Sequence, residues 1–263
     1  MSGAARRGGF AGWVSRLEDG AIIRAAFYVM LAGTLSVLYI DYSELSGAVA
    51  GTVMPLQPVL PAFDPDTTQT SPGPEITTGF EALQGPLEIV LAPGGVLTLT
   101  GTIDVGAAQR FRTEVEARGE YVRTVVLNSP GGSVQDAMLI GTLIGSSGFD
   151  TRVDAGALCA SSCPLAFAGG KERHATPQSA IGVHQVFAAV TAGASSLGLN
   201  AAGDAMSNAQ SVTAEVTRHL TGLGVDPALW IHALETPPDR LYYLAPDELV
   251  KYKLVTRMAG AGT

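Results

Sequence analysis

The feature that most constrains this chain is an apolar run near its amino end, Ala21–Ile40, which Arg24 alone interrupts. At about 1.5 Å per residue, a helix of that length spans about 30 Å, the thickness of the hydrocarbon core of a membrane. Arg24 lies one turn from the end of the run, where its side chain can reach the lipid headgroups. The sequence therefore predicts a single transmembrane helix over residues 21–40.

Charge is distributed asymmetrically around this run. The first 24 residues contain four arginines and two acids, whereas residues 41–109 contain eight acids and neither lysine nor arginine. Because positive charge favours the cytoplasmic side of a membrane, residues 1–20 are expected in the cytoplasm and the chain after Asp41 in the periplasm or other extracytoplasmic space. This makes the chain a single-pass protein of the inner (cell) membrane. A cleaved signal peptide stays open as an alternative, since Ala48-Val49-Ala50 offers a small-residue cleavage site.

A Pro-rich linker is expected over residues 41–86. Six prolines fall within Pro55–Pro74, among Thr, Ser, Gly and Asp. Such a composition cannot build a core and favours an extended stalk. The chain is thus predicted to consist of a cytoplasmic segment, a membrane helix, this linker and one folded domain, with the ranges 1–20, 21–40, 41–86 and 87–263.

Composition excludes several classes of function. The net charge is −8 and no basic cluster is present, so nothing would neutralise the phosphates of a nucleic acid. Two cysteines are too few for a disulfide scaffold and, alone, for a structural zinc site. We therefore expect no nucleic acid partner, no metal and no cofactor.

From residue 87 onward the hydrophobic pattern becomes α/β. Short alternating or β-branched runs predict strands over residues 97–100, 122–127, 151–153, 180–184 and 254–256. Helical spacing predicts helices over residues 107–117, 133–148, 208–220, 227–234 and 246–251. Residues 188–206, rich in Ala, Gly, Ser and Thr, are expected to form a surface insertion. The alternation of strands and helices favours right-handed crossovers and a largely parallel sheet.

Three short motifs carry groups suited to chemistry. Asn128-Ser129-Pro130-Gly131-Gly132-Ser133 joins a strand to a helix, and its glycines can expose backbone N–H groups. Cys159-Ala160-Ser161-Ser162-Cys163-Pro164 places a serine at a helix start, where the helix field favours negative charge. Val183-His184-Gln185 places an imidazole, the usual base for a serine hydroxyl, at a strand end. Each motif alone also fits a structural role, as a tight turn, a helix cap and a buried core histidine.

The order and spacing of these motifs resemble the Clp protease proteolytic subunit and its crotonase-fold relatives, over roughly Leu97–Val255. The glycine loop at 128–133, the segment Gly156–Ser161 and the stretch 168–185 are similar to that family's glycine loop, nucleophile segment and approach to the catalytic histidine. Residues 236–255 are similar to the segment that carries its catalytic aspartate. The Cys-x-Ser-x-Cys arrangement looks closer still to a periplasmic branch of the superfamily. The resemblance implies a crotonase-like (Clp protease-like) α/β domain of repeated ββα units arranged in a spiral.

Carried over position by position, the resemblance makes Ser161 the nucleophile and His184 the general base. Asp239 becomes the group that orients and charges the imidazole. The amides of Gly132 and Ser162 become the oxyanion hole that stabilises the negative oxygen formed in acyl transfer.

Three details of this assignment stay open. Asp226 is the reserve for the third member of the triad, and Ser162 could compete with Ser161 as the nucleophile. Cys159 and Cys163 flank the nucleophile, which the protease itself does not require. They could form a disulfide in an oxidising compartment, or they could remain two small buried thiols.

The function implied is that of a membrane-anchored, extracytoplasmic serine hydrolase, a serine protease that acts on a peptide or protein substrate. Family resemblance also suggests a homo-oligomer. One alternative is a non-catalytic crotonase-fold binding or scaffold module tethered to the membrane. Another is an acyl-CoA enzyme that would use the same two amides on a thioester, although coenzyme A is cytoplasmic and the domain is expected outside. The sequence assigns no residue to a substrate pocket.

Overall fold

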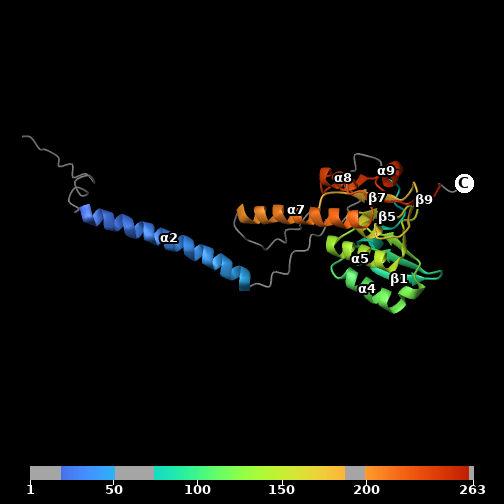
Figure 1. The fold of residues 1–263 in the computed structure, drawn as a ribbon, viewed down its shortest axis with the longest axis horizontal. Coiled ribbons are helices and arrows are strands. Elements are labelled where there is room, and N and C mark those ends of the chain that lie inside the picture. Colours follow the sequence, from blue (N-terminus) through green and yellow to red (C-terminus); the bar gives the residue numbers. More distant parts are fainter. Residues whose placement is uncertain (1–18, 51–73, 187–198, 261–263) are drawn as a thin grey trace, which may run out of the picture. The chain divides into compact units, whose positions relative to one another are not determined.

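The computed structural model describes residues 19–50, 74–186 and 199–260 (Figure 1). Two compact units divide the chain, Met1–Leu56 and Gln57–Thr263. In the first unit, helix α2 (Asp19–Ala50) contains an eighteen-residue window, Ile23–Ile40, with a mean hydropathy of 1.7. Within the described ranges this is the one helix long and apolar enough to cross a membrane.

The apolar side chains of α2 are not confined to one face of the helix. Ile23, Phe27, Val29 and Met30 are each at least 60% exposed, and no part of the apolar window is buried. A helix that is apolar all round is typical of a membrane span or of a buried core helix. By length and composition, this window is a candidate membrane span.

Two sheets form the framework of the second unit. The larger sheet has six strands, of which the first pair is antiparallel and the others are parallel, in the order β1 (Glu88–Ala92), β2 (Val96–Thr100), β3 (Thr124–Asn128), β4 (Asp150–Arg152), β6 (Arg173–Ala175) and β9 (Arg257–Met258). In the smaller sheet, β7 (Ala180–Val183) lies between β5 (Leu158–Ala160), to which it is parallel, and β8 (Tyr242–Tyr243), to which it is antiparallel.

Helices lie beside the strands of these sheets (Figure 1). They are α3 (Phe80–Gln84), α4 (Ala107–Arg118), α5 (Val134–Ser147), α6 (Cys163–Phe167), α7 (Leu199–Gly222), α8 (Leu229–Glu235) and α9 (Pro246–Lys251), with a 3-10 turn at Gly119–Tyr121. Helix α4 packs on α5, α5 on α6, α6 on α7, and α8 on β7. A mixed sheet with packed helices confirms the predicted α/β fold.

Helix α5, which follows the glycine loop, is fixed at both ends by the signals in its sequence. The Ser133 hydroxyl accepts the N–H of Asp136 at 3.2 Å, and Gly148 ends the helix in the left-handed conformation. The Asp136 carboxylate in turn accepts the N–H groups of Gly106 and Ala108 at 3.1 and 3.0 Å, which ties the start of α4 to α5. These contacts anchor the helix whose first residues border the candidate site.

One hydrophobic core lies between these helices and the larger sheet. Fully buried side chains from β2, α4, α5 and α6 contribute to it, including Leu97, Phe111, Ile140, Ile144 and Phe167. Each such side chain stabilises the fold by about 1.5–3 kcal/mol relative to an exposed one. A rigid core of this kind can hold the loops at the ends of β3 and β5 in fixed positions.

Three sequence-based boundaries differ from the observed ones. Helix α2 continues to Ala50, and contacts of the domain begin by Thr77, whose N–H donates to the Gly156 carbonyl at 2.9 Å. Residues 51–73 lie outside the described residues, so the Pro-rich linker stays a prediction. The expected insertion at 188–206 is helical from Leu199 onward, because α7 begins there.

Candidate active site

The nucleophile candidate lies in the turn between β5 and α6. Ser161 has φ of 68°, one of two positive values among the described residues other than glycine, and its N–H donates to the Gly182 carbonyl at 2.8 Å. The left-handed conformation costs a residue with a Cβ about 1–2 kcal/mol. Such strain is concentrated at functional sites, and a sharp strand-to-helix turn is the arrangement that presents a nucleophilic serine in hydrolases.

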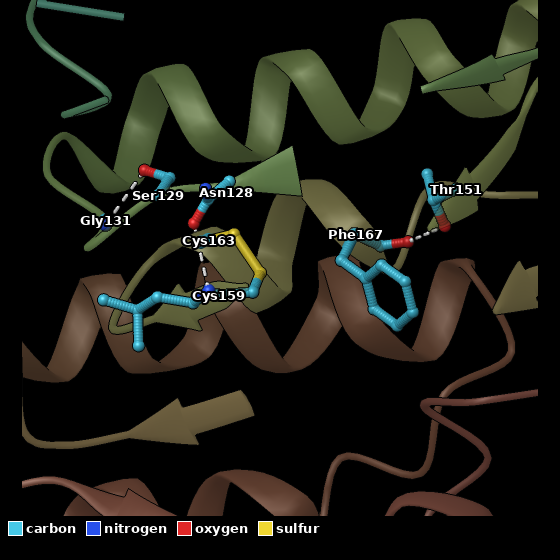
Figure 2. Close-up of a disulfide and its surroundings, with 8 residues drawn as sticks. Asn128, Ser129, Gly131, Thr151, Cys159, Cys163 and Phe167 are labelled. Atoms are coloured by element: carbon cyan, nitrogen blue, oxygen red, sulfur yellow. Dashed lines mark hydrogen bonds between the residues drawn. A yellow bond between two sulfur atoms is a disulfide. The ribbon is translucent and has the colours of Figure 1, made fainter. Parts of the chain in front are cut away.

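The glycine loop reaches this turn because β3 pairs with both sheets. Beyond its last pairing with β2, the strand forms a bridge to β5: the Ser129 N–H donates to the Leu158 carbonyl at 2.7 Å, and the Ala160 N–H donates to the Ser129 carbonyl at 3.0 Å. Figure 2 shows the Asn128 side chain bridging the same two strands, its Oδ1 accepting the Leu158 N–H at 3.0 Å. Residues 130–132 are thereby placed against the nucleophile turn.

Gly131 lies in direct contact with this turn. Its φ is 95°, and a Cβ added there would lie 2.6 Å from the Ala160 carbonyl oxygen and 2.7 Å from the Ser161 Cβ. Neither the backbone conformation nor the space permits a side chain. The close approach of two backbones, rather than turn geometry alone, therefore requires glycine here.

Substitution of Gly131 by alanine is expected to destabilise the domain by about 3 kcal/mol or more, since strain and overlap with fixed backbone add. Gly148→Ala is the matched control, because Gly148 has φ of 70° with no atom within 4 Å of the added Cβ. That variant should lose only about 1–2 kcal/mol. Denaturant unfolding of both purified full-length variants measures the difference, and equal losses would contradict the close approach.

The base candidate meets the nucleophile candidate directly. His184 follows the end of β7, which is parallel to β5 with Ala160 opposite Gly182. Its Nε2 lies 2.9 Å from the Ser161 Oγ. Both residues are buried, with 4% and 2% of their surfaces exposed. Exclusion of water strengthens a hydrogen bond of this kind.

Burial lowers the pKa of His184 from 6.5 to about 4, and the backbone carbonyl of Pro238 acts in the opposite direction. The imidazole is therefore neutral at physiological pH. For Nε2 to accept the Ser161 proton, Nδ1 has to carry the ring proton. Nδ1 is buried and has no partner in hydrogen-bond geometry among the described residues, so the Pro238 carbonyl favours the protonated ring without forming a well-aligned hydrogen bond.

The lowered pKa of His184 predicts a pH-dependent stability. Between pH 6.5 and about 4, the unfolded chain protonates this imidazole while the folded chain keeps it neutral. The free energy of unfolding should therefore be independent of this group above pH 6.5 and fall by about 3 kcal/mol as the pH drops toward 4. Urea unfolding of wild type and His184→Gln across this range measures the effect. The same pH dependence in both proteins would contradict the assignment.

Two backbone N–H groups directly follow, in the chain, the residues that meet at the nucleophile turn: Gly132 follows Gly131, and Ser162 follows Ser161. The N–H groups of Gly132 and Ser162 donate to no acceptor among the described residues, although both residues are buried. The neighbouring amides differ, since Gly131 donates to the Ser129 Oγ at 3.1 Å and Ser161 to the Gly182 carbonyl. Buried amides are nearly always paired. The amides of Gly132 and Ser162 therefore differ from most buried amides in having no acceptor within the described part of the chain.

The carboxylate predicted for the third position is not in contact with the imidazole. Asp239 is exposed, and its Oδ1 lies 3.8 Å from the Arg240 Nε. Asp226, the reserve, accepts the Ala228 N–H at 2.9 Å near the start of α8. The structure thus brings Ser161 and His184 together and leaves both aspartates elsewhere.

Sequence reasoning did not identify the groups that hold the histidine segment. The Gln185 N–H donates to the Thr236 carbonyl at 2.9 Å, and its side-chain amide donates to the Leu234 carbonyl at 2.6 Å. These bonds fix the segment after α8 beside His184, which explains why the Pro238 carbonyl acts on the imidazole. The acceptors are backbone carbonyls, so no side-chain pattern could have signalled them.

Cys159 and Cys163 are joined by a disulfide with a Cα–Cα distance of 5.2 Å, and both are fully buried (Figure 2). Among the described residues, no group of three His, Cys, Asp or Glu side chains could hold a metal ion.

Comparison with known proteins identifies the family. Residues 107–260 match the family model of the Clp protease. A mutant of the membrane-bound stomatin-specific protease 1510-N is similar in structure, with a TM-score of 0.44 and 17% identity over 62% of this chain and 77% of that one. A mutant of ClpP1 from Listeria monocytogenes gives a TM-score of 0.47 and 16% identity over 64% of this chain and 92% of that one.

No curated protein matches the sequence. The family match nevertheless includes the glycine loop, the nucleophile turn and His184. It also covers more than half of the residues, and on that basis the chain belongs to the Clp protease family.

Proposed function

We propose that this chain is a membrane-anchored serine peptidase in which Ser161 is the nucleophile and His184 the general base. The observation that carries the proposal is the distance of 2.9 Å between the Ser161 Oγ and the His184 Nε2. Membership of the Clp protease family supports a peptide or protein as the substrate and assembly into a homo-oligomer. A serine hydroxyl is a weak nucleophile by itself and needs an adjacent base of this kind.

The reaction follows from these positions. The neutral imidazole removes the Ser161 proton as the oxygen attacks the carbonyl carbon of the substrate, and the resulting imidazolium then protonates the leaving amine. A water molecule, activated by the same imidazole, hydrolyses the acyl-enzyme and restores Ser161. The lowered pKa of His184 keeps the ring neutral before attack.

The amides of Gly132 and Ser162 are the proposed oxyanion hole. Attack on a carbonyl places negative charge on its oxygen, and two preorganised N–H donors stabilise that charge. Their lack of any acceptor among the described residues supports this role. Removal of one such donor typically costs about 10²–10³ in rate.

Asp239 is kept as the proposed third member of the triad, with Asp226 in reserve. The support is its position directly after Pro238, whose carbonyl acts on the imidazole. The role requires the Asp239 side chain to turn from Arg240, 3.8 Å away, toward the Nδ1 of His184. Until it does so, the base acts within a Ser–His pair.

Labelling with a fluorophosphonate tests the catalytic proposal. The reagent reacts with serines that an adjacent base activates, and digestion followed by mass spectrometry identifies the modified residue. Membranes containing the full-length chain should give one adduct, on Ser161. Adducts on another serine of the domain would contradict the assignment.

The location of the domain is proposed to be extracytoplasmic, with α2 as the anchor. Support comes from the arginines before the apolar window and the acids after it. A phosphatase reporter fused after Thr263 should be active, and the chain should resist carbonate extraction at full length. Release of a shortened chain would indicate a cleaved signal peptide. An inactive reporter would place the domain in the cytoplasm and restore the acyl-CoA alternative.

A non-catalytic scaffold module is the second candidate. Two observations favour it: Ser161 is only 2% exposed, and neither aspartate contacts the imidazole of His184. This candidate predicts no fluorophosphonate adduct on the membrane-embedded chain. It also predicts that a peptide substrate remains uncleaved under conditions where the chain is folded.

A further inference from the structure

The nucleophile candidate lies inside the short loop that the Cys159–Cys163 disulfide closes. Cys159 belongs to β5 and Cys163 is the first residue of α6, so their disulfide encloses Ala160, Ser161 and Ser162 (Figure 2). The catalytic reaction proposed above requires neither sulfur. Their position around the reacting hydroxyl therefore calls for an explanation of its own.

We propose that the Cys159–Cys163 disulfide is a positioning element that holds Ser161 in its left-handed, reactive conformation. This inference rests on the proposed role of Ser161 as nucleophile. Without the disulfide, the turn should relax toward unstrained conformations in which the Ser161 hydroxyl leaves the His184 imidazole. The domain should remain folded.

The conformation of the turn needs an external restraint. A residue with a Cβ at φ of 68° occupies a sparsely populated region, and it persists only where the surroundings over-determine it. The bond from the Ser161 N–H to Gly182 fixes one side of the turn. On its other side Gly131 approaches without forming a hydrogen bond to the turn.

Helix α6 offers little restraint from its own sequence. It has five residues, and Ser162 at its N-cap makes no capping hydrogen bond through its side chain. The Ser162 Oγ is instead buried with no partner among the described residues. An N-cap side chain would normally fix the first turn of a helix. Here the disulfide from Cys163 to Cys159 in β5 restrains the first turn of the helix instead.

Global stability is a weaker explanation for the disulfide. The stabilisation gained from a disulfide grows with the length of the loop that it closes, and this loop joins residues only four apart. Both cysteines are also packed in the main hydrophobic core, where alanine or another small apolar residue fits the chemistry of the surroundings. Loss of the link should therefore change the turn more than the fold.

The test compares the double variant Cys159→Ala/Cys163→Ala with wild type, both as full-length chains in detergent. The second-order rate constant for fluorophosphonate labelling of Ser161 should fall about ten- to hundredfold, as expected when the disulfide no longer offsets the strain that disfavours the reactive conformation. Circular dichroism should show the same folded domain. Alkylation of unreduced wild type should modify neither cysteine.

Thr151→Val is the matched control. The Thr151 Oγ1 donates to the Phe167 carbonyl at 2.8 Å, at the opposite end of α6 from the disulfide (Figure 2). This variant perturbs the same helix without touching the turn, so its labelling rate should equal that of wild type. Labelling of the double variant at the wild-type rate would overturn the inference, as would an equal fall in both variants or two alkylated cysteines in wild type.

Failure of the proposed function would be visible separately, as absence of labelling in wild type itself. In that case the imidazole ¹⁵N resonances of His184 provide the test. They should differ between wild type and the double variant, because the Ser161 hydroxyl bonds to Nε2 at 2.9 Å only while the turn is held. Identical resonances would overturn the positioning role.

Discussion

Ser161→Ala is expected to lower kcat/KM for a cleaved peptide by about 10⁴-fold or more and to abolish fluorophosphonate labelling. The reason is that the substitution removes the proposed nucleophilic oxygen, which lies 2.9 Å from the proposed base. The fold should be unaffected, since alanine differs from serine by one oxygen atom. Steady-state kinetics and labelling of the purified full-length chain measure both effects.

The adjacent serine provides the control for this prediction. Ser162→Ala removes a buried hydroxyl that has no partner among the described residues, so it should cost little stability. It leaves the Ser162 backbone N–H, the proposed oxyanion donor, in place. Activity of Ser162→Ala should stay within about tenfold of wild type. A larger fall would be expected only if the oxyanion donor itself were lost, since one such donor is worth more than about tenfold in rate. Loss of labelling in Ser162→Ala and its survival in Ser161→Ala would exchange the two roles.

His184→Ala is expected to reduce kcat by about 10⁴-fold, because loss of the base removes about as much catalysis as loss of the nucleophile. In wild type, activity should rise with pH around a pKa of about 4 and stay level above it, since only the neutral imidazole accepts the Ser161 proton. In the variant this rise should be absent. The pH dependence of kcat/KM measures both.

A second histidine, His219, which is half-buried, serves as the comparison for His184. His219 bonds to the Leu165 carbonyl at 2.9 Å, and burial lowers its pKa as well. His219→Gln should therefore affect stability and leave kcat at the wild-type value. An equal fall in kcat for both histidine variants would mean that the loss comes from the fold rather than from a missing base.

Local signals in the sequence predicted the elements that frame the site. Ser133 and Gly148 bound α5 as expected, because capping depends on residues next to one another in the chain. Strand β3 and helix α9 also lie where β-branched and Pro-initiated patterns predicted them. The side chain of Leu139 in α5, by contrast with those of Met138 and Ile140, is 47% exposed.

Elements that depend on tertiary pairing were missed or displaced. Strand β5 has three residues, without a β-branched side chain, and it forms because β3 and β7 pair with it on either side. Strand β8 has two residues and depends likewise on β7. The last strand is β9 at Arg257–Met258 rather than residues 254–256, since its register is set by β6.

The candidate site divides in the same way. The family resemblance in motif order and spacing selected Ser161 and His184, which lie in hydrogen-bond contact. Two features could not be predicted from the sequence. They are the φ of 68° at Ser161 and the contact of Gly131 with the nucleophile turn. Both arise from the approach of two loops distant in the chain. Asp239 was selected by resemblance. The position of its carboxylate depends on how the segment after α8 folds back.

A crystal structure of the chain after reaction with a fluorophosphonate would test most directly whether Ser161 and its neighbours form one catalytic site. The account predicts a phosphorus–oxygen bond at the Ser161 Oγ, with the phosphonyl oxygen about 2.7–3.1 Å from the N–H nitrogens of Gly132 and Ser162. An adduct on a different residue would contradict it, and so would a phosphonyl oxygen that points away from both amides.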